Sequence, residues 1–533
     1  MKRFLTALLT VCLAGPLVAA PGEWHVYLDA SIANRLHAAG DTLWCCTNGG
    51  ILVFDLRDST FTQLADGLSL PSNDVSSVVL DETGSLWAGF LGGFVARIDD
   101  PNGPEPFVKR YGASDGMLAD SVSALEIVGD DIYYGSSNGV AKFFENFHSR
   151  EPGLTDALEG VQINDLLSVH PDTLWIATES GIVRFVRPTL SLDVFDVGKT
   201  NALCTFDGRV RAAGVGGVRR FTGDAWEAMP GDLGGREAAA IAAGGGELVA
   251  VTAEGAWRWN GSLFAAIDIG GMKNLHNDVY RMGWNNILRA VAVDDNGTPW
   301  VGGVYTPQLR GVYVSAWTDG EWRNHAPNGP PHNASALGGL DAAAGGGVWL
   351  STEKNGVGYR DPDGTWNNYT LMRFDDPGND RLLSYRFNNL AILYDTRGFL
   401  WLNAQNYDLD MIRVGDPRSK ADDEWAHFPL GGAITSNRYV AAAEDPAGNR
   451  WFLSDATLFE SGLWGIDVAD PDTSDWFAIN PIVESRMGSG AVFGCAFDGD
   501  DRVYLALRGF GIQLWITQGF GWDELTDLSN DIW

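Results

Sequence analysis

The chain has 533 residues, of which 45% are hydrophobic and 20% charged, a composition typical of folded soluble proteins and not of disordered or collagen-like chains. Its 37 basic and 69 acidic residues give a formal net charge of −32, which argues against binding nucleic acid or anionic lipid surfaces. The 66 glycines and 21 tryptophans indicate many tight turns and many large packed rings.

Residues 1–20 have the pattern of a secretory signal peptide. Lys2 and Arg3 form a basic start, an apolar stretch follows, and small residues end at Ala20. No later stretch reaches the roughly 18 consecutive apolar residues of a membrane-spanning helix, so we expect no transmembrane segment after the signal peptide. These features predict an exported protein, located in the periplasm, at the cell surface or outside the cell.

A repeat begins soon after the signal peptide. Its core is Asp-x-x-Gly-x-x-Trp, and seven weaker copies accompany four full ones. The full copies are Asp81/Gly84/Trp87, Asp294/Gly297/Trp300, Asp395/Gly398/Trp401 and Asp445/Gly448/Trp451, and the weaker ones centre on Trp44, Tyr133, Trp175, Val210, Leu248, Trp349 and Val503. The eleven centres lie about 46 residues apart on average, which is the period of a β-propeller blade.

Each unit predicts four short antiparallel strands. The Asp and Gly predict a tight turn before the strand that carries the Trp, a glycine-rich turn follows, and a second aromatic residue marks the outer strand. These outer aromatics are Phe61, Trp226, Phe264, Trp322, Trp366, Trp425, Trp476 and Trp522. No helical period is sustained anywhere, so the fold class is all-β, with β-propeller repeats of four-stranded antiparallel blades.

One large ring per unit is best explained by packing between neighbouring blades, although stacking on sugars is the functional alternative. We therefore assign a structural role in the blade core to the seven repeat tryptophans Trp44, Trp87, Trp175, Trp300, Trp349, Trp401 and Trp451.

Eleven units exceed the 4–8 blades of one propeller, which favours two propellers in tandem. The unit spacing lengthens between Leu248 and Trp300, so we place a boundary near residue 270. This gives a first propeller over 21–270, with about six repeats, and a second over 271–533, with about five. Residues 23–27 match an outer strand that would close a blade. The residues after Leu525 match the lead-in to another blade, so we expect the second propeller to be incomplete at residue 533.

The run from Gly67 to Phe94 resembles the two-component regulator propeller repeat. The first hundred residues resemble the PorZ N-terminal β-propeller more closely, through Trp24 and the runs Gly40–Trp44, Asn48–Ile51 and Asp66–Leu68. The first resemblance implies a periplasmic sensor region of a histidine kinase. The second implies a surface component of the type IX secretion system, which carries two propellers and a C-terminal sorting domain and handles anionic lipopolysaccharide. We expect no sorting domain within these 533 residues.

The residue patterns that resemble catalytic or metal-binding motifs are better explained as turns. Two Gly-x-Ser-x-Gly runs, at residues 112–116 and 135–139, fall in blade connections and not in the strand-to-helix turn of a nucleophile elbow. Acidic turns near Asp294, Asp361 and Asp498 lack the final Glu of an EF-hand loop, and the eight scattered histidines form no zinc motif. The four cysteines after the signal peptide are best explained as buried small residues. We expect no cofactor and no metal site.

Four polar residues precede the innermost strand of a blade at matched positions, where propeller chains approach one mouth of the central channel. They are either a ring that binds a polar ligand or Asx turns that enter the strands. These residues are Asn73, Asp120, Asn286 and Asn437.

The sequence favours a non-catalytic exported propeller protein that binds or scaffolds at the cell envelope. Its partner would be an envelope polysaccharide, a lipopolysaccharide or another envelope protein. One alternative is the ligand-sensing ectodomain of a two-component regulator, and another is a propeller lyase or hydrolase. The oligomeric state is left open.

Overall fold

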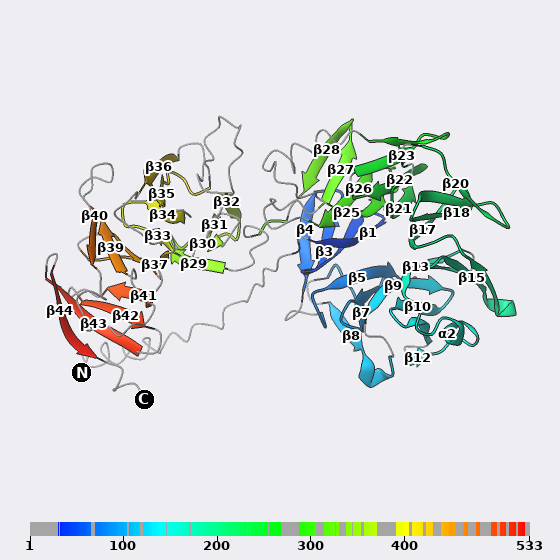
Figure 1. The fold of residues 1–533 in the computed structure, drawn as a ribbon, viewed down its shortest axis with the longest axis horizontal. Coiled ribbons are helices and arrows are strands. Elements are labelled where there is room, and N and C mark those ends of the chain that lie inside the picture. Colours follow the sequence, from blue (N-terminus) through cyan, green and yellow to red (C-terminus); the bar gives the residue numbers. More distant parts are fainter. Residues whose placement is uncertain are drawn as a thin grey trace, which may run out of the picture.

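The computed structural model describes most residues from 30 to 527; the longest segments outside the description are 1–29, 268–286, 305–313, 370–390, 430–438, 467–475 and 480–491. Within the described residues the fold consists of eleven antiparallel sheets, each built from four consecutive strands (Figure 1). We number these sheets as blades 1–11 in chain order. The all-β propeller fold expected from the repeat is thereby confirmed.

Blades 1–4 comprise β1 Ala33–Ala39, β2 Thr42–Thr47, β3 Gly50–Asp55, β4 Thr60–Leu64; β5 Val75–Leu80, β6 Leu86–Phe90, β7 Phe94–Asp99, β8 Phe107–Tyr111; β9 Val122–Val128, β10 Asp131–Ser136, β11 Gly139–Phe144, β12 Phe147–Ser149; and β13 Ile163–Ser168, β14 Thr173–Thr178, β15 Ile182–Val186, β16 Ser191–Phe195. Short helical turns lie between some of them: η1 Ala113–Asp115, α2 Leu154–Ala157 and η2 Arg187–Thr189.

Blades 5–7 comprise β17 Thr200–Phe206, β18 Arg209–Gly214, β19 Gly217–Phe221, β20 Trp226–Ala228; β21 Ala238–Gly244, β22 Glu247–Thr252, β23 Gly255–Trp259, β24 Phe264–Ala266; and β25 Ile287–Val293, β26 Pro299–Val304, β27 Val314–Thr318, β28 Glu321–His325.

Blades 8–11 comprise β29 Leu337–Ala342, β30 Val348–Thr352, β31 Val357–Arg360, β32 Trp366–Tyr369; β33 Ile392–Tyr394, β34 Phe399–Ala404, β35 Asp408–Arg413, β36 Glu424–Pro429; β37 Tyr439–Glu444, β38 Arg450–Ser454, β39 Gly462–Ile466, β40 Trp476–Ile479; and β41 Val492–Phe497, β42 Arg502–Leu507, β43 Gly511–Gln518, β44 Gly521–Asp527.

The repeat folds as its chemistry predicts. All eleven repeat centres lie on the second strand of a blade, and the eight outer aromatics lie on fourth strands. In the copy at Asp81, Oδ1 accepts the backbone N–H groups of Thr83 and Ser85 (2.9 and 3.0 Å), while Oδ2 accepts the indole N–H of Trp87 (3.0 Å). Gly84 has a φ of +81°, which a side chain would strain. The same Asp–indole bond recurs in the other three full copies.

The tryptophan rings lie between blades. Trp44 packs with side chains of blade 2, Trp87 with blade 3, and Trp175 with blade 5. All seven repeat tryptophans are buried, at 0–6% exposure. Each ring therefore adds apolar contact across the interface to the next blade, which is where a propeller obtains its core.

Blades 1–7 form a closed ring. A separate apolar cluster joins each neighbouring pair, and the last one joins blade 7 to blade 1. At this seam the ring of Phe54 lies 5.3 Å from Trp300 and 4.9 Å from His325, between ring centroids. The packing therefore ends the first ring after residue 325 and not at the boundary expected near residue 270, because the seventh sheet (residues 287–325) completes the ring.

Blades 8–11 form a second group, drawn apart from the first in Figure 1. Trp349 of blade 8 packs with Ile392, Leu400 and Leu402 of blade 9. Residues 23–27, expected to close a blade, lie outside the described residues.

The cysteines are free among the described residues. Cys45 and Cys46 are neighbours on β2 and point to opposite faces, so Cys45 packs against blade 7 and Cys46 against blade 2. Both are buried, as expected for small apolar side chains.

A candidate ligand site in the channel of the first ring

The central channel of the first ring contains a cavity of about 800 Å³. Its walls are the innermost strands of all seven blades: β1, β5, β9, β13, β17, β21 and β25. A propeller brings residues from remote parts of the chain together only at this axis, so the channel is the place where a composite site can form.

Each innermost strand of this ring begins with a bulge, where the pairing with the second strand slips by one residue. In five blades the side chain of the bulged residue donates a hydrogen bond to the first backbone carbonyl of the next innermost strand. The donors and acceptors are Asn34 to Val75 (2.8 Å), Ser76 to Val122 (2.6 Å), Ser123 to Ile163 (2.6 Å), Asn164 to Thr200 (2.9 Å) and Asn201 to Ala238 (3.0 Å).

We call these five bonds the inter-blade clamp. The bulged residues of blades 6 and 7 are Ala239 and Arg289. Ala239 has no side-chain donor, so it cannot extend the clamp.

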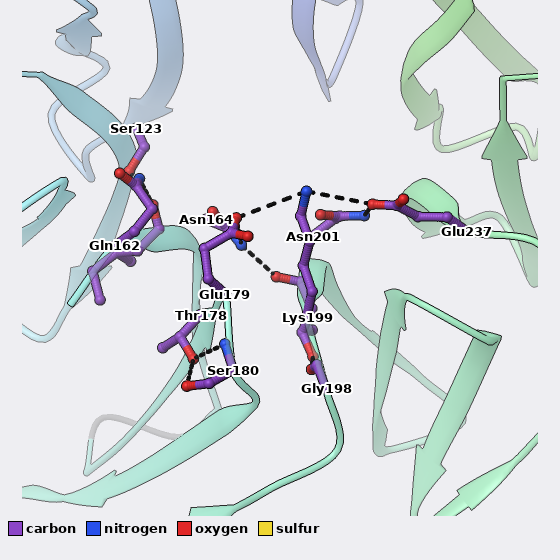
Figure 2. Close-up of polar contacts among 12 residues, drawn as sticks. Ser123, Gln162, Asn164, Thr178, Glu179, Ser180, Gly198, Lys199, Asn201 and Glu237 are labelled. Carbon is purple, nitrogen blue, oxygen red and sulfur yellow. Dashed lines mark hydrogen bonds and ion pairs between the residues drawn. The ribbon is translucent and has the colours of Figure 1, made fainter.

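A charged group stands at the mouth over blades 4–6, and we call it the rim. Figure 2 shows Lys199 between Glu179 and Glu237, with N–O distances of 3.8 and 3.5 Å. The amide of Asn164 donates to Glu179 and that of Asn201 to Glu237, each at 3.0 Å. Hydrogen bonding by Asn201 and the charge of Lys199 lower the pKa of Glu237. The three charged side chains are 39–51% exposed, so water and ligands can reach them.

Arg35 crosses the channel below the rim. It belongs to blade 1, yet its Nη1 lies 2.6 Å from Asp165 Oδ1 of blade 4, and its Nη2 donates to the Asn164 carbonyl. Asp165 Oδ2 in turn accepts the backbone N–H of Leu203 in blade 5. Three blades are thus tied by one ion pair whose carboxylate is 5% exposed.

Beside this ion pair, burial and the charge of Asp165 raise the pKa of Glu126 to about 8. Glu126 is therefore mostly uncharged at neutral pH. Burial likewise lowers the pKa of His37 and raises the pKa of the Cys204 thiol to about 12. The lower channel thus holds a neutral imidazole, a protonated thiol and a largely neutral carboxyl group.

Of the four polar residues expected at the mouth, Asn73 lies in the described part of the chain. It is half-buried, and its carbonyl accepts the N–H of Gly50 (2.6 Å). Asp120, Asn286 and Asn437 lie outside the described residues.

The sequence interpretation missed the bulged residues, which lie a few positions after the polar residues that it expected at the mouth. A recurring Asn at the second position of three innermost strands, Asn34, Asn164 and Asn201, was the available signal.

The two Gly-x-Ser-x-Gly runs lie in turns, and so do the acidic residues Asp294 and Asp361. Residues 112–116 contain the helical turn η1, and residues 135–139 span the turn between β10 and β11. Among the described residues, no three His, Cys, Asp or Glu side chains are arranged to hold a metal ion. Asp361, in one of the acidic turns, pairs with Arg418. No helix in the described part of the chain is long and apolar enough to cross a membrane.

Comparison with known proteins finds similarity in fold. No family model and no curated protein matches the chain. Among solved structures, PorZ, an essential surface component of the type-IX secretion system of Porphyromonas gingivalis, is 14% identical, with 95% of this chain and 82% of PorZ covered and a TM-score of 0.41. The extracellular domain of a hybrid two-component system of B. thetaiotaomicron is 13% identical, with 94% of this chain and 78% of that domain covered and a TM-score of 0.39.

Both kinds of protein that the sequence resembles are thus among the solved structures similar to this chain. An ancestral GH74 enzyme is 11% identical, with 96% of this chain and 87% of the enzyme covered and a TM-score of 0.52. At these identities the similarity concerns the fold, and a propeller fold hosts many unrelated functions.

Proposed function

We propose that this chain is an exported, non-catalytic propeller module of the cell envelope that holds a polar ligand at the channel mouth of its first ring. The observation that carries the proposal is the cavity of about 800 Å³ whose mouth bears exposed charged and amide side chains. Ligand pockets commonly combine such a preformed cavity with a few convergent polar groups. The signal-peptide pattern supports export.

The rim suits recognition of hydroxyl and amide groups. Lys199 is a donor, and Glu179 and Glu237 are acceptors whose Oε1 atoms are oriented by Asn164 and Asn201. Because the clamp and the rim share these two asparagines, the ring that holds the blades together also orients the rim. Asn73, Asp120 and Asn286 remain proposed as further ligand contacts at the mouth of the first ring. Asn437 precedes β37 of blade 10 and remains proposed as a ligand contact in the second group.

The test is co-sedimentation of the purified full chain with insoluble envelope fractions of the producing organism. The double variant Glu179→Gln/Glu237→Gln keeps both side-chain shapes but removes the two carboxylates. We expect its bound fraction to fall at least tenfold, because amides can neither pair with Lys199 nor accept hydrogen bonds as strongly.

The matched control is Glu227→Gln, which removes an exposed carboxylate paired with Arg220 on the outer strands of blade 5. It should bind as the native chain does. Equal binding by the rim variant and the native chain would refute the rim as the site, and absence of binding by the native chain would refute the proposed function.

A further inference from the structure

Blade 2 departs from the repeat at one position on the side of the ring where the channel mouth lies. The third strand begins opposite the end of the second, and five other blades of the first ring carry glycine there: Gly50, Gly139, Gly181, Gly217 and Gly255. Blade 2 carries Phe94, which pairs with Phe90 after a loop of three residues. A departure from an otherwise consistent local pattern is where function is expected.

Three of these glycines, Gly50, Gly139 and Gly181, are required by packing, because a β-carbon would clash with a backbone carbonyl. A β-carbon on Gly50 would lie 2.1 Å from the Leu64 carbonyl oxygen, and one on Gly181 would lie 2.2 Å from that of Phe195. In those blades the backbone leaving the fourth strand or entering the next blade therefore rests on the glycine. In blade 2 the Phe94 ring lies there instead.

The ring of Phe94 rests on glycine backbone. A β-carbon on Gly112 would lie 3.1 Å from two of its ring atoms, and one on Gly92 would lie 3.5 Å from a third. Despite this support, 37% of Phe94 and 41% of its neighbour Leu91 are exposed. An exposed aromatic ring fixed against backbone is a rigid platform.

Polar groups adjoin the platform. The Asp115 carboxylate accepts the Gly112 N–H (2.9 Å) and the Ser114 hydroxyl (3.3 Å), and both side chains are exposed. Leu91, on the other side, lines the channel cavity. We call Leu91, Phe94, Ser114 and Asp115 the blade-2 ledge; it leads from the channel mouth outward over the blade.

We propose that the blade-2 ledge binds one sugar ring of a neutral oligosaccharide whose neighbouring units reach the channel mouth. A pyranose ring offers an apolar C–H face that suits Phe94 and hydroxyl edges that suit Asp115 and Ser114. The chain's net charge of −32 and the carboxylate of Asp115 disfavour an anionic glycan. Two exposed apolar side chains are also too few for the core of a protein interface.

This inference rests on the proposed function, since it names the ligand class of the same mouth. The probe is a panel of neutral hexasaccharides (maltohexaose, cellohexaose and laminarihexaose), with hexagalacturonate as the anionic member, titrated calorimetrically into the full chain. We expect at least one neutral member to bind more tightly than hexagalacturonate. Phe94→Ala should weaken that binding about tenfold, and Phe94→Trp should retain it.

The control variant is Phe107→Ala, an exposed phenylalanine (65%) at the opposite end of blade 2. It should bind like the native chain, and all variants should share its unfolding temperature. The inference is overturned if no neutral hexasaccharide binds, or if Phe94→Ala binds as the native chain does. If the rim variant still loses envelope binding in either case, the inference alone fails and the proposed function survives.

Discussion

At the scale of single residues, the aspartate of the repeat does more than form a turn. In the copy at Asp395 one carboxylate oxygen accepts two backbone N–H groups, and the other accepts the Trp401 indole (2.9 Å). The spacing predicted the turn, because the turn is local. It could not predict Arg450, which arrives from the next blade and is 0% exposed.

Arg450 is joined to Asp395 through its Nε (2.7 Å) and Nη2 (2.6 Å), and its guanidinium lies 5.4 Å from the centroid of the Trp401 ring. Removing one partner of a buried ion pair leaves an uncompensated charge, at a typical cost of about 3–5 kcal/mol, whereas replacing both by apolar groups is often neutral. Asp395→Ala should therefore destabilise the second group strongly.

The measurement is calorimetric unfolding of Asp395→Ala beside the double variant Asp395→Ala/Arg450→Met. We expect the double variant to regain part of the lost stability, because the orphaned charge is gone while the turn and indole hydrogen bonds of Asp395 stay lost. A double variant that is less stable than Asp395→Ala would contradict the burial of this pair.

At the scale of elements, the strands were accessible from sequence because apolar runs, turn residues and aromatic positions recur in each unit. The bulge at the start of each innermost strand was not, since a bulge is a property of pairing between two strands and leaves no fixed residue type. The clamp depends on that bulge, so Asn34, Asn164 and Asn201 escaped notice although they recur.

The inter-blade clamp lacks a hydrogen bond from blade 6 to blade 7, and a substitution can supply it. Ala239 is the bulged residue of blade 6, so Ala239→Asn should donate to the first carbonyl of β25, as Asn201 does to Ala238. One added hydrogen bond is worth about 0.5–1.5 kcal/mol, which should raise the unfolding temperature of the first ring. Ala239→Leu, similar in size but without a donor, should not. Equal effects of the two substitutions would mean that side-chain volume, and not the clamp, decides stability here.

At the scale of the whole molecule, the repeat period predicted how many blades there are but not which ring each belongs to. Spacing measures the lengths of loops, whereas ring membership depends on contacts between remote residues. The seam between blades 1 and 7 brings Phe54 against Trp300 and His325, which lie more than 240 residues further along the chain. No local pattern encodes that contact, so a boundary drawn from spacing fell one blade early.

Closure of the first ring by blade 7 is the central claim, because the channel and its rim exist only in a closed ring. Calorimetry of two segments tests it directly, one spanning residues 21–329 and the other ending at residue 270. We predict one sharp cooperative transition for the longer segment. For the shorter one we predict none, since blades 1 and 6 would expose the faces that blade 7 covers. A sharp transition of equal or higher temperature in the shorter segment would show a ring closed by six blades and would contradict this account.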